Sequence, residues 1–255
     1  MAKISYTALA FFKKKCYNGK DMFSLQYLIV LLAQFIAAAL VISIHEFAHA
    51  YSAYKCGDPT ARFAGRMTLN PLKHFDPLGI VLFAIAGFGW AKPVPINPDN
   101  FKDYKKGSIW TSAAGVLANY LTAFLVYPLF VLVVTYVCPL FSGKYAASFL
   151  YYLFYGIFAF SLNFCIFNLL PFYPLDGFRL VEATGNVRGK IYWFLQRYGY
   201  SVLLGLIFLH ILSDRIWFLN YIDVLGYFLT FAVKVFGRPI TALWDWIFRL
   251  FGVGL

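Results

Sequence analysis

The sequence is poor in charge. Asp, Glu, Lys and Arg together make up 13% of its 255 residues, whereas hydrophobic residues make up 61%. Soluble globular domains contain about 25% charged and about 45–50% apolar residues. The shortage of charge therefore excludes an ordinary soluble domain and indicates an α-helical integral membrane protein. The net charge of +11 comes from lysines and arginines between long apolar runs, which membrane topology and anionic lipid headgroups explain better than nucleic acid does.

The sequence also lacks features that define other classes of protein. No C-x-x-C pair occurs, which argues against a disulfide framework and a zinc knuckle. The cysteines are widely spaced, at Cys16, Cys56, Cys138 and Cys165. The apolar stretch at residues 4–12 is short and precedes its lysines, so we expect no secretory signal peptide. Without internal repeats, low-complexity stretches or a soluble domain, the bulk of the chain is expected to be one membrane domain.

Long apolar runs predict the membrane spans. A spanning helix needs about 20 apolar residues, and such runs lie at residues 22–56, 108–137, 148–171, 198–213 and 216–236. We therefore expect about five transmembrane helices. The apolar run at residues 78–90 is too short to span and is bracketed by prolines, so it predicts a re-entrant hairpin between the first two spans.

These runs divide the chain into three parts. Residues 1–21 form a basic N-terminal segment, residues 22–236 a single polytopic membrane domain, and residues 237–255 an interfacial C-terminal helix with apolar residues at helical spacing. Lysine and arginine mark the cytoplasmic side. If the spans alternate, residues 55–107, 178–197 and 234–255 share one side with 15 of these residues, against seven on the other. We expect the first side to be cytoplasmic.

The motif "HEFAH" lies inside the first predicted span. His45 and His49 are four residues apart, so a helix presents both imidazoles on one face, and Glu46 lies beside them. H-E-x-x-H is the pattern by which two histidines bind zinc while the glutamate acts as general base. Ionisable residues inside a span are costly and mark functional sites. The motif therefore predicts a catalytic zinc site within the membrane.

A catalytic zinc usually has a third protein ligand. The candidates in this sequence are His74, Asp76, Asp176, Glu182 and His210. The stretch "FNLLPFYPLDGFRL" contains Asp176 and two prolines that break helical hydrogen bonding. Irregular backbone at membrane depth persists only inside protein or along a water-filled cavity, which favours Asp176. Asp76 precedes a proline, where ordinary turn chemistry explains an aspartate.

Three motifs in this order bring a family resemblance. "HEFAH", "AGVLAN" at residues 114–119 and "NLLPFYPLDG" at residues 168–177 resemble the site-2 protease family of intramembrane zinc metalloproteases. "NPLKHFDPLG" and "GFGWAKPVPINP" resemble its compact bacterial branch, and nothing in the sequence looks like a PDZ or CBS domain. The resemblance covers about residues 25–180. It implies one Zn²⁺ per chain, ligated by His45, His49 and Asp176, with Glu46 as general base.

The resemblance also implies a substrate and a location. The substrate is expected to be a transmembrane protein, cut within or near the bilayer during regulated intramembrane proteolysis. The membrane is expected to be a bacterial plasma membrane, with the active site toward the cytoplasm. The hairpin, expected at residues 78–95, would present a backbone edge to an extended substrate. The expected substrate-binding residues are Gly87, Gly89, Trp90, Asn119 and Asn168.

Two alternatives accompany these predictions. Asn119 and Asn168 could instead make hydrogen bonds between helices. A membrane metal transporter or metal sensor could also place two histidines and an aspartate at membrane depth. Such a protein needs the ligands but not a base such as Glu46, and many transporters have inverted repeats, which this sequence lacks. The sequence therefore favours a protease.

Overall fold

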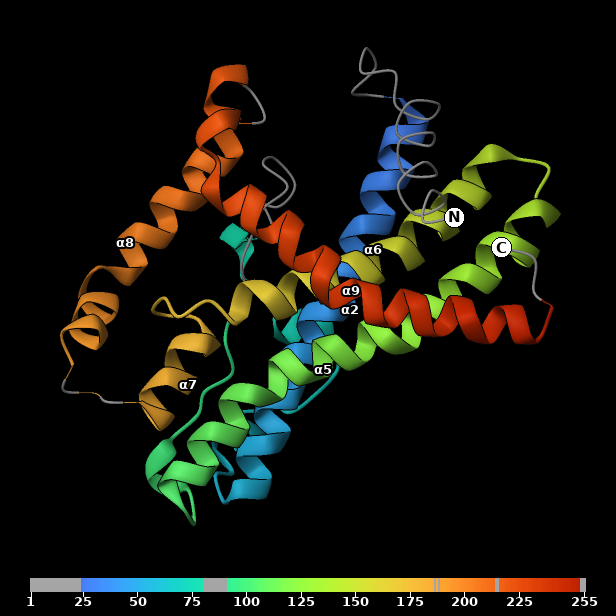
Figure 1. Cartoon of the computed structure of the whole chain (residues 1–255). Helices are drawn as coiled ribbons and strands as arrows, with labels where there is room; N and C mark the ends of the chain where they lie inside the picture. Colours follow the sequence, from blue (N-terminus) through green and yellow to red (C-terminus); the bar gives the residue numbers. More distant parts are fainter. Residues whose placement is uncertain (1–23, 80–90, 186, 188, 214–215, 253–255) are drawn as a thin grey trace.

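The computed structural model describes residues 24–79, 91–185, 187, 189–213 and 216–252. Within these residues the regular structure is helical, without strands (Figure 1). Four helical segments are long and apolar enough to cross a membrane. They are α2 (Leu25–Cys56), Tyr104–Leu140, α6 (Lys144–Asn168) and α8 (Lys190–Ser213). The second of these comprises α5 (Tyr104–Leu132), a π-helical turn (Val133–Val137) and a 3₁₀ turn (Cys138–Leu140). The prediction of an α-helical membrane protein is confirmed.

The C-terminal part differs from the predicted pattern. A 3₁₀ turn (Trp217–Ile222) leads into α9 (Val224–Leu250), which runs without a break through the predicted boundary at residues 236 and 237. Pro239 lies inside this helix. A proline disfavours a helix interior, and burial of the neighbouring Ile240 in one hydrophobic cluster with Leu162 supports the helix there. The predicted fifth span and the predicted C-terminal helix are therefore parts of one element, which is not among the four segments above.

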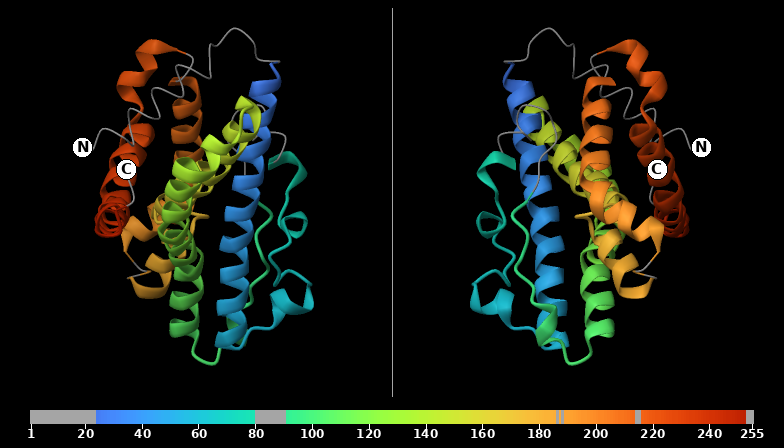
Figure 2. Two further views of the ribbon diagram at one scale, coloured as in Figure 1. Left: turned by 90° about the vertical axis from the view of Figure 1, so that its right-hand side faces the viewer. Right: turned by 90° about the vertical axis from the view of Figure 1, so that its left-hand side faces the viewer.

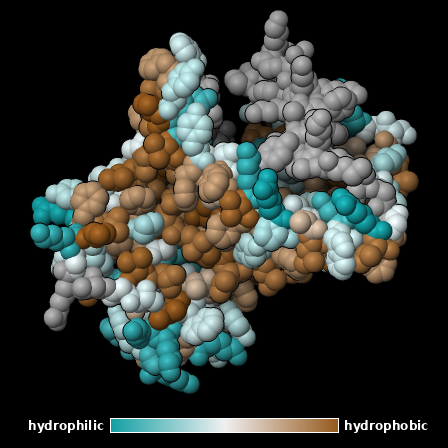
Figure 3. Space-filling model, viewed as in Figure 1, coloured by the Kyte–Doolittle hydropathy of each residue, from teal (hydrophilic) through white to brown (hydrophobic). Residues whose placement is uncertain are grey.

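The centre of the molecule is a bundle of α2, α5 and α6, which α9 crosses (Figures 1 and 2). Small residues let the backbones approach: Ala33, Ala37, Ala50 and Ala53 of α2 are completely buried. Leucines 117, 121 and 125 recur every fourth residue on the exposed face of α5, as expected for side chains in lipid. Hydrophobic side chains form a broad band across one face, and hydrophilic side chains gather at its lower end (Figure 3).

A polar network closes the end of α2. Gly57 caps the helix with φ 114°, a left-handed conformation that favours glycine. Asp58 follows and is completely buried. Its carboxylate accepts hydrogen bonds from the backbone N–H of Asn97 (2.7 Å), from the side chain of Asn100 (2.8 Å) and from Thr60. Burial raises the pKa of Asp58, but these hydrogen bonds outweigh it and hold the pKa below its usual value. The network fastens residues 97–100 to the end of α2.

The described part of the segment between α2 and α5 contains several short helical elements. These are α3 (Thr60–Phe63) and two 3₁₀ turns (Pro71–Lys73 and Pro98–Asn100). Phe75 and Ala91 form an antiparallel bridge, and the Lys92 N–H donates to the His74 carbonyl at 2.9 Å. The predicted hairpin lies mostly at residues 80–90, outside the described residues. Its two flanks lie side by side, and this segment runs along one side of α2 (Figure 2).

Candidate metal centre

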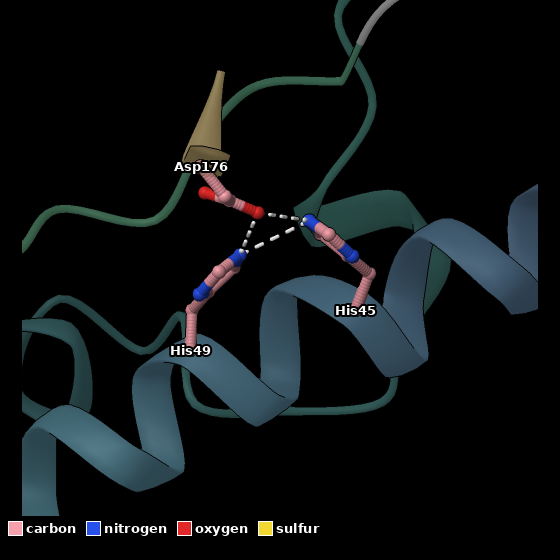
Figure 4. Close-up of side chains that lie close together, drawn as sticks. All are labelled: His45, His49 and Asp176. Atoms are coloured by element: carbon pink, nitrogen blue, oxygen red, sulfur yellow. Dashed lines mark hydrogen bonds and ion pairs between the residues drawn. The ribbon is translucent and has the colours of Figure 1, made fainter. Parts of the chain in front are cut away.

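Helix α2 and the short helix α7 (Asp176–Thr184) bring three donor atoms together (Figure 4). His45 and His49 lie on one face of α2, and Asp176 is the first residue of α7. The Nε2 atoms of the two histidines are 3.0 Å apart. Asp176 Oδ2 lies 3.0 Å from His49 Nε2 and 3.2 Å from His45 Nε2. All three side chains are buried, so three polar groups from distant parts of the chain share one small space.

The remaining nitrogen of each imidazole has its own partner on α5. His49 Nδ1 lies 2.7 Å from the Thr111 carbonyl oxygen, which can only accept. Nδ1 of His49 therefore carries the proton, and its Nε2 presents a lone pair. His45 Nδ1 lies 3.0 Å from the side-chain amide of Asn119. In the structure the amide nitrogen of Asn119 faces Nδ1, and its Oδ1 has no partner; turning the amide by 180° would bring Oδ1 to Nδ1 and give His45 the same tautomer as His49. Such partners orient metal-binding histidines.

Two glycines create the space for this arrangement. A Cβ atom on Gly115 of α5 would collide with His49 Nε2 and would lie 2.6 Å from His45 Cε1. A Cβ atom on Gly177 would collide with the Leu169 carbonyl at the end of α6. Gly115 lets α5 approach the imidazoles, and Gly177 lets the start of α7 approach α6. Both positions require glycine for close approach, since neither has a positive φ.

The donor set fits a zinc ion. Two neutral imidazole nitrogens and one carboxylate oxygen is a common ligand set of catalytic zinc sites. The separations of 3.0–3.2 Å are close to the edge of about 3.3 Å that a tetrahedron has when its bonds are about 2.0–2.1 Å. Among the described residues this is the one cluster of three such side chains whose donor atoms can reach a common ion.

The other candidates for a third ligand lie elsewhere and have other partners. His74 is completely buried, and its Nε2 lies 2.8 Å from the Thr68 carbonyl. Asp76 caps a turn by accepting from two backbone N–H groups, each at 3.0 Å. Glu182 accepts from the hydroxyl of Tyr192, and His210 pairs with Asp223 at 2.7 Å. The geometry therefore selects Asp176 from the five candidates.

Glu46 faces the same cavity as the three donors. The cavity has a volume of about 120 Å³, which is room for several water molecules. Its lining comprises His45, Glu46, His49, Pro93, Val94, Ile96, Asn168, Pro174, Asp176 and Arg179. Glu46 Oε2 accepts a hydrogen bond of 2.8 Å from the backbone N–H of Val94. A carboxylate, three metal-binding donors and space for water therefore meet between α2, residues 93–96 and the start of α7.

The predicted substrate-binding residues fall in three places. Asn119 is completely buried and contacts His45. Asn168 lines the cavity and donates a hydrogen bond of 3.0 Å to the Phe164 carbonyl within α6. Gly87, Gly89 and Trp90 lie outside the described residues.

Sequence analysis did not identify Val94 or Thr111. Both contribute backbone groups, and such groups leave no signature in the choice of side chain.

Comparisons with known proteins find metalloprotease relatives. The model of peptidase family M50 matches residues 132–210, a region that contains Asp176 but not the HEFAH motif. The chain is 39% identical over 193 residues to "Putative zinc metalloprotease YwhC" of Bacillus subtilis, covering 73% of this chain and 85% of that protein. It is 27% identical over 167 residues to "Putative zinc metalloprotease Rip2" of Mycolicibacterium smegmatis, covering 64% of this chain and 61% of that protein. No solved structure matches.

Proposed function

The chain belongs to peptidase family M50, the site-2 proteases, and we propose that it is an intramembrane protease that cuts membrane-spanning proteins within or near the bilayer. Zinc-dependent peptidase activity follows from the family. The observation that carries the finer proposal is the convergence of His45, His49 and Asp176 beside Glu46, at a cavity inside a bundle of membrane-spanning helices.

We assign the metal ligands from the donor geometry. His45 Nε2, His49 Nε2 and Asp176 Oδ2 would hold one Zn²⁺ per chain. When bound there, zinc supplies Lewis acidity that polarises the scissile carbonyl and makes water easier to deprotonate. Thr111 and Asn119 orient the two imidazoles, so the role proposed for Asn119 is to position a ligand. This is the hydrogen bond between helices that the sequence left open as an alternative.

Glu46 is the proposed general base. The Val94 N–H holds Oε2, while Oε1 has no hydrogen-bond partner among the described residues and is available to a water molecule in the cavity. Glu46 takes the proton of the attacking water and later gives it to the leaving amine. A transporter or metal sensor would need the three ligands without this base, so the presence of Glu46 in the same cavity favours hydrolysis.

The substrate is proposed to bind as an extended peptide along residues 93–96. Pro93 and Pro95 have a fixed φ and favour extended backbone, and Pro93, Val94 and Ile96 line the cavity. Because Pro93 and Pro95 lack an N–H and the Val94 N–H already donates to Glu46, an added peptide would bond this edge chiefly through its carbonyl groups and the Ile96 N–H. Asn168 lies beside the same cavity and is proposed to contact the substrate. Gly87, Gly89 and Trp90 remain predicted members of this edge.

The surroundings are proposed from the distribution of charge. The basic segment that follows α2 favours the cytoplasmic side for this end of the site. The proposed location is a bacterial plasma membrane, and the proposed role is regulated intramembrane proteolysis. The expected partners are a transmembrane protein substrate and the surrounding lipid.

Zinc content and cleavage together test the proposal. Purified wild-type protein should contain about one zinc ion per chain and should cut a panel of tagged single-span proteins in proteoliposomes. Glu46→Gln should keep the zinc and lose cleavage. Asp176→Ala should lose the zinc, whereas Asp76→Ala, which alters only a turn, should keep it. Wild-type cleavage by Glu46→Gln, or unchanged zinc in Asp176→Ala, would overturn the proposal.

A further inference from the structure

An extended segment, residues 92–97, crosses the cavity beside Glu46 and is fastened by a buried arginine. Arg66 lies between α3 and the turn Pro71–Lys73, and its side chain is buried. Its Nη2 donates to the Lys92 carbonyl at 2.6 Å and to the Pro93 carbonyl at 3.3 Å. Among the described residues no carboxylate forms an ion pair with Arg66. A buried charge is costly unless it is hydrogen-bonded, so this guanidinium is committed to two neutral carbonyls.

The second of these carbonyls belongs to the peptide group that contacts Glu46. The Pro93 C=O and the Val94 N–H are the two ends of one trans peptide group and point in opposite directions. The C=O end faces Arg66, and the N–H end donates to Glu46 Oε2 at 2.8 Å. A single peptide group therefore bridges a buried cation and the proposed general base. Each of these hydrogen bonds polarises the peptide group and strengthens the other.

Neighbouring contacts prevent this peptide group from sliding along the site. The Lys92 N–H donates to the His74 carbonyl at 2.9 Å, and the Asn97 N–H donates to the buried Asp58 carboxylate at 2.7 Å. Pro93 and Pro95 fix the φ angles on either side of Val94. The segment is thus held at both ends, and Arg66 contacts the Pro93–Val94 peptide group between them.

We propose that Arg66 is a positioning residue that holds the carboxylate of Glu46 in its working orientation through the Pro93–Val94 peptide group. This inference rests on the proposed role of Glu46 as general base. Arg66 touches neither the metal-binding donors nor the cavity. Its removal should therefore slow the chemical step without releasing zinc, because Glu46 keeps its charge but loses its fixed orientation.

The test compares Arg66→Ala and Arg66→Lys with Arg62→Ala. Arg62 is a matched control, because it is a nearby arginine on α3 whose side chain is exposed and donates a hydrogen bond to the Tyr54 hydroxyl. Each variant is measured for zinc content, for kcat and KM on a cleaved single-span protein, and for hydrogen exchange of the Val94 amide. Arg66→Ala should lower kcat by up to about 100-fold, the scale that misplacement of a catalytic group produces. Its KM should stay within about threefold, and its zinc content should match the wild type.

Hydrogen exchange separates this inference from the proposed function, because it requires no cleavage. The Val94 amide should exchange faster in Arg66→Ala than in Arg62→Ala. Lysine supplies a charge without the planar fork of arginine. The exchange rate of the Val94 amide in Arg66→Lys should therefore lie between the rates in Arg66→Ala and in the wild type.

Several results would overturn the inference. They are unchanged Val94 exchange in Arg66→Ala, an equal loss of kcat in Arg62→Ala, or loss of zinc in Arg66→Lys. If Arg66→Ala does not fold, Arg66→Lys decides by the same measurements. Wild-type cleavage by Glu46→Gln would instead refute the role of Glu46, while the exchange measurement would still report whether Arg66 holds the peptide group.

Discussion

Replacement of Gly115 by alanine should disrupt the metal centre through a single methyl group. The added Cβ would lie 2.6 Å from His45 Cε1 and would collide with His49 Nε2. Carbon atoms pack at about 3.5–4.0 Å, so the imidazoles must move by about 1 Å or α2 and α5 must separate. Overpacking of this kind costs about 1–3 kcal/mol. Alanine also favours the helix over glycine by about 1 kcal/mol, which offsets part of the cost.

Zinc affinity should therefore fall more than stability does. The net change in the free energy of unfolding without metal should lie between about 0 and 2 kcal/mol destabilising. A shift of the ligand atoms by about 1 Å is large beside a zinc–nitrogen bond of about 2.0–2.1 Å, so we expect the dissociation constant for zinc to rise at least about tenfold, or about 1.4 kcal/mol. Competition with a chromogenic chelator measures this constant, and a thermal melt of the metal-free protein measures stability.

Gly205→Ala is the matched control. Gly205 lies within α8, and nothing lies within 4 Å of its added Cβ. This substitution brings the same gain in helix propensity without a collision, so zinc affinity and cleavage should equal those of the wild type. If Gly115→Ala binds zinc and cleaves as well as Gly205→Ala does, the close approach of α5 to the imidazoles is not part of the site, and the reasoning fails.

Three further predictions concern the hydrogen bond of His45, the buried Asp58 and the removal of zinc. Asn119→Ala removes the partner of His45 Nδ1 and should weaken zinc binding about 10–100-fold in a chelator titration. The control Asn163→Ala, whose amide donates to the Ala159 carbonyl within α6, should show no such loss. Equal zinc affinities of the two variants would contradict the orienting role of Asn119. Asp58 has a lowered pKa, so its contribution to stability is present above the usual aspartate pKa of about 4 and is lost as the pH falls through its lower folded value. Melts should therefore show Asp58→Asn less stable than the wild type at pH 7, with the difference shrinking in acid; a gap that widens in acid would refute the assignment. Removal of zinc by a chelator should abolish cleavage and lower the melting temperature, and added zinc should restore both in the wild type but not in His49→Ala.

The sequence by itself determined the membrane class and predicted the three donor residues that the fold brings together. Long apolar runs require helices in lipid, because only internal hydrogen bonding satisfies their backbone there. Helical periodicity alone places His45 and His49 on one face. The two prolines before Asp176 identified the irregular backbone that carries the third donor. These features are local, so a linear pattern can reveal them.

Only the tertiary structure decided how the site is supported. The continuity of α9 through Pro239 depends on packing of its neighbours, which outweighs the local preference to break the helix. Every residue could supply the carbonyl of Thr111, and every residue except proline could supply the N–H of Val94, so no side chain in the sequence marks these groups. Arg66 reads as one basic residue among many until the fold places it 2.6 Å from the Lys92 carbonyl. The periodicity of a sequence predicts which face of a helix carries a residue. Contacts between residues far apart in the chain are set by packing in three dimensions.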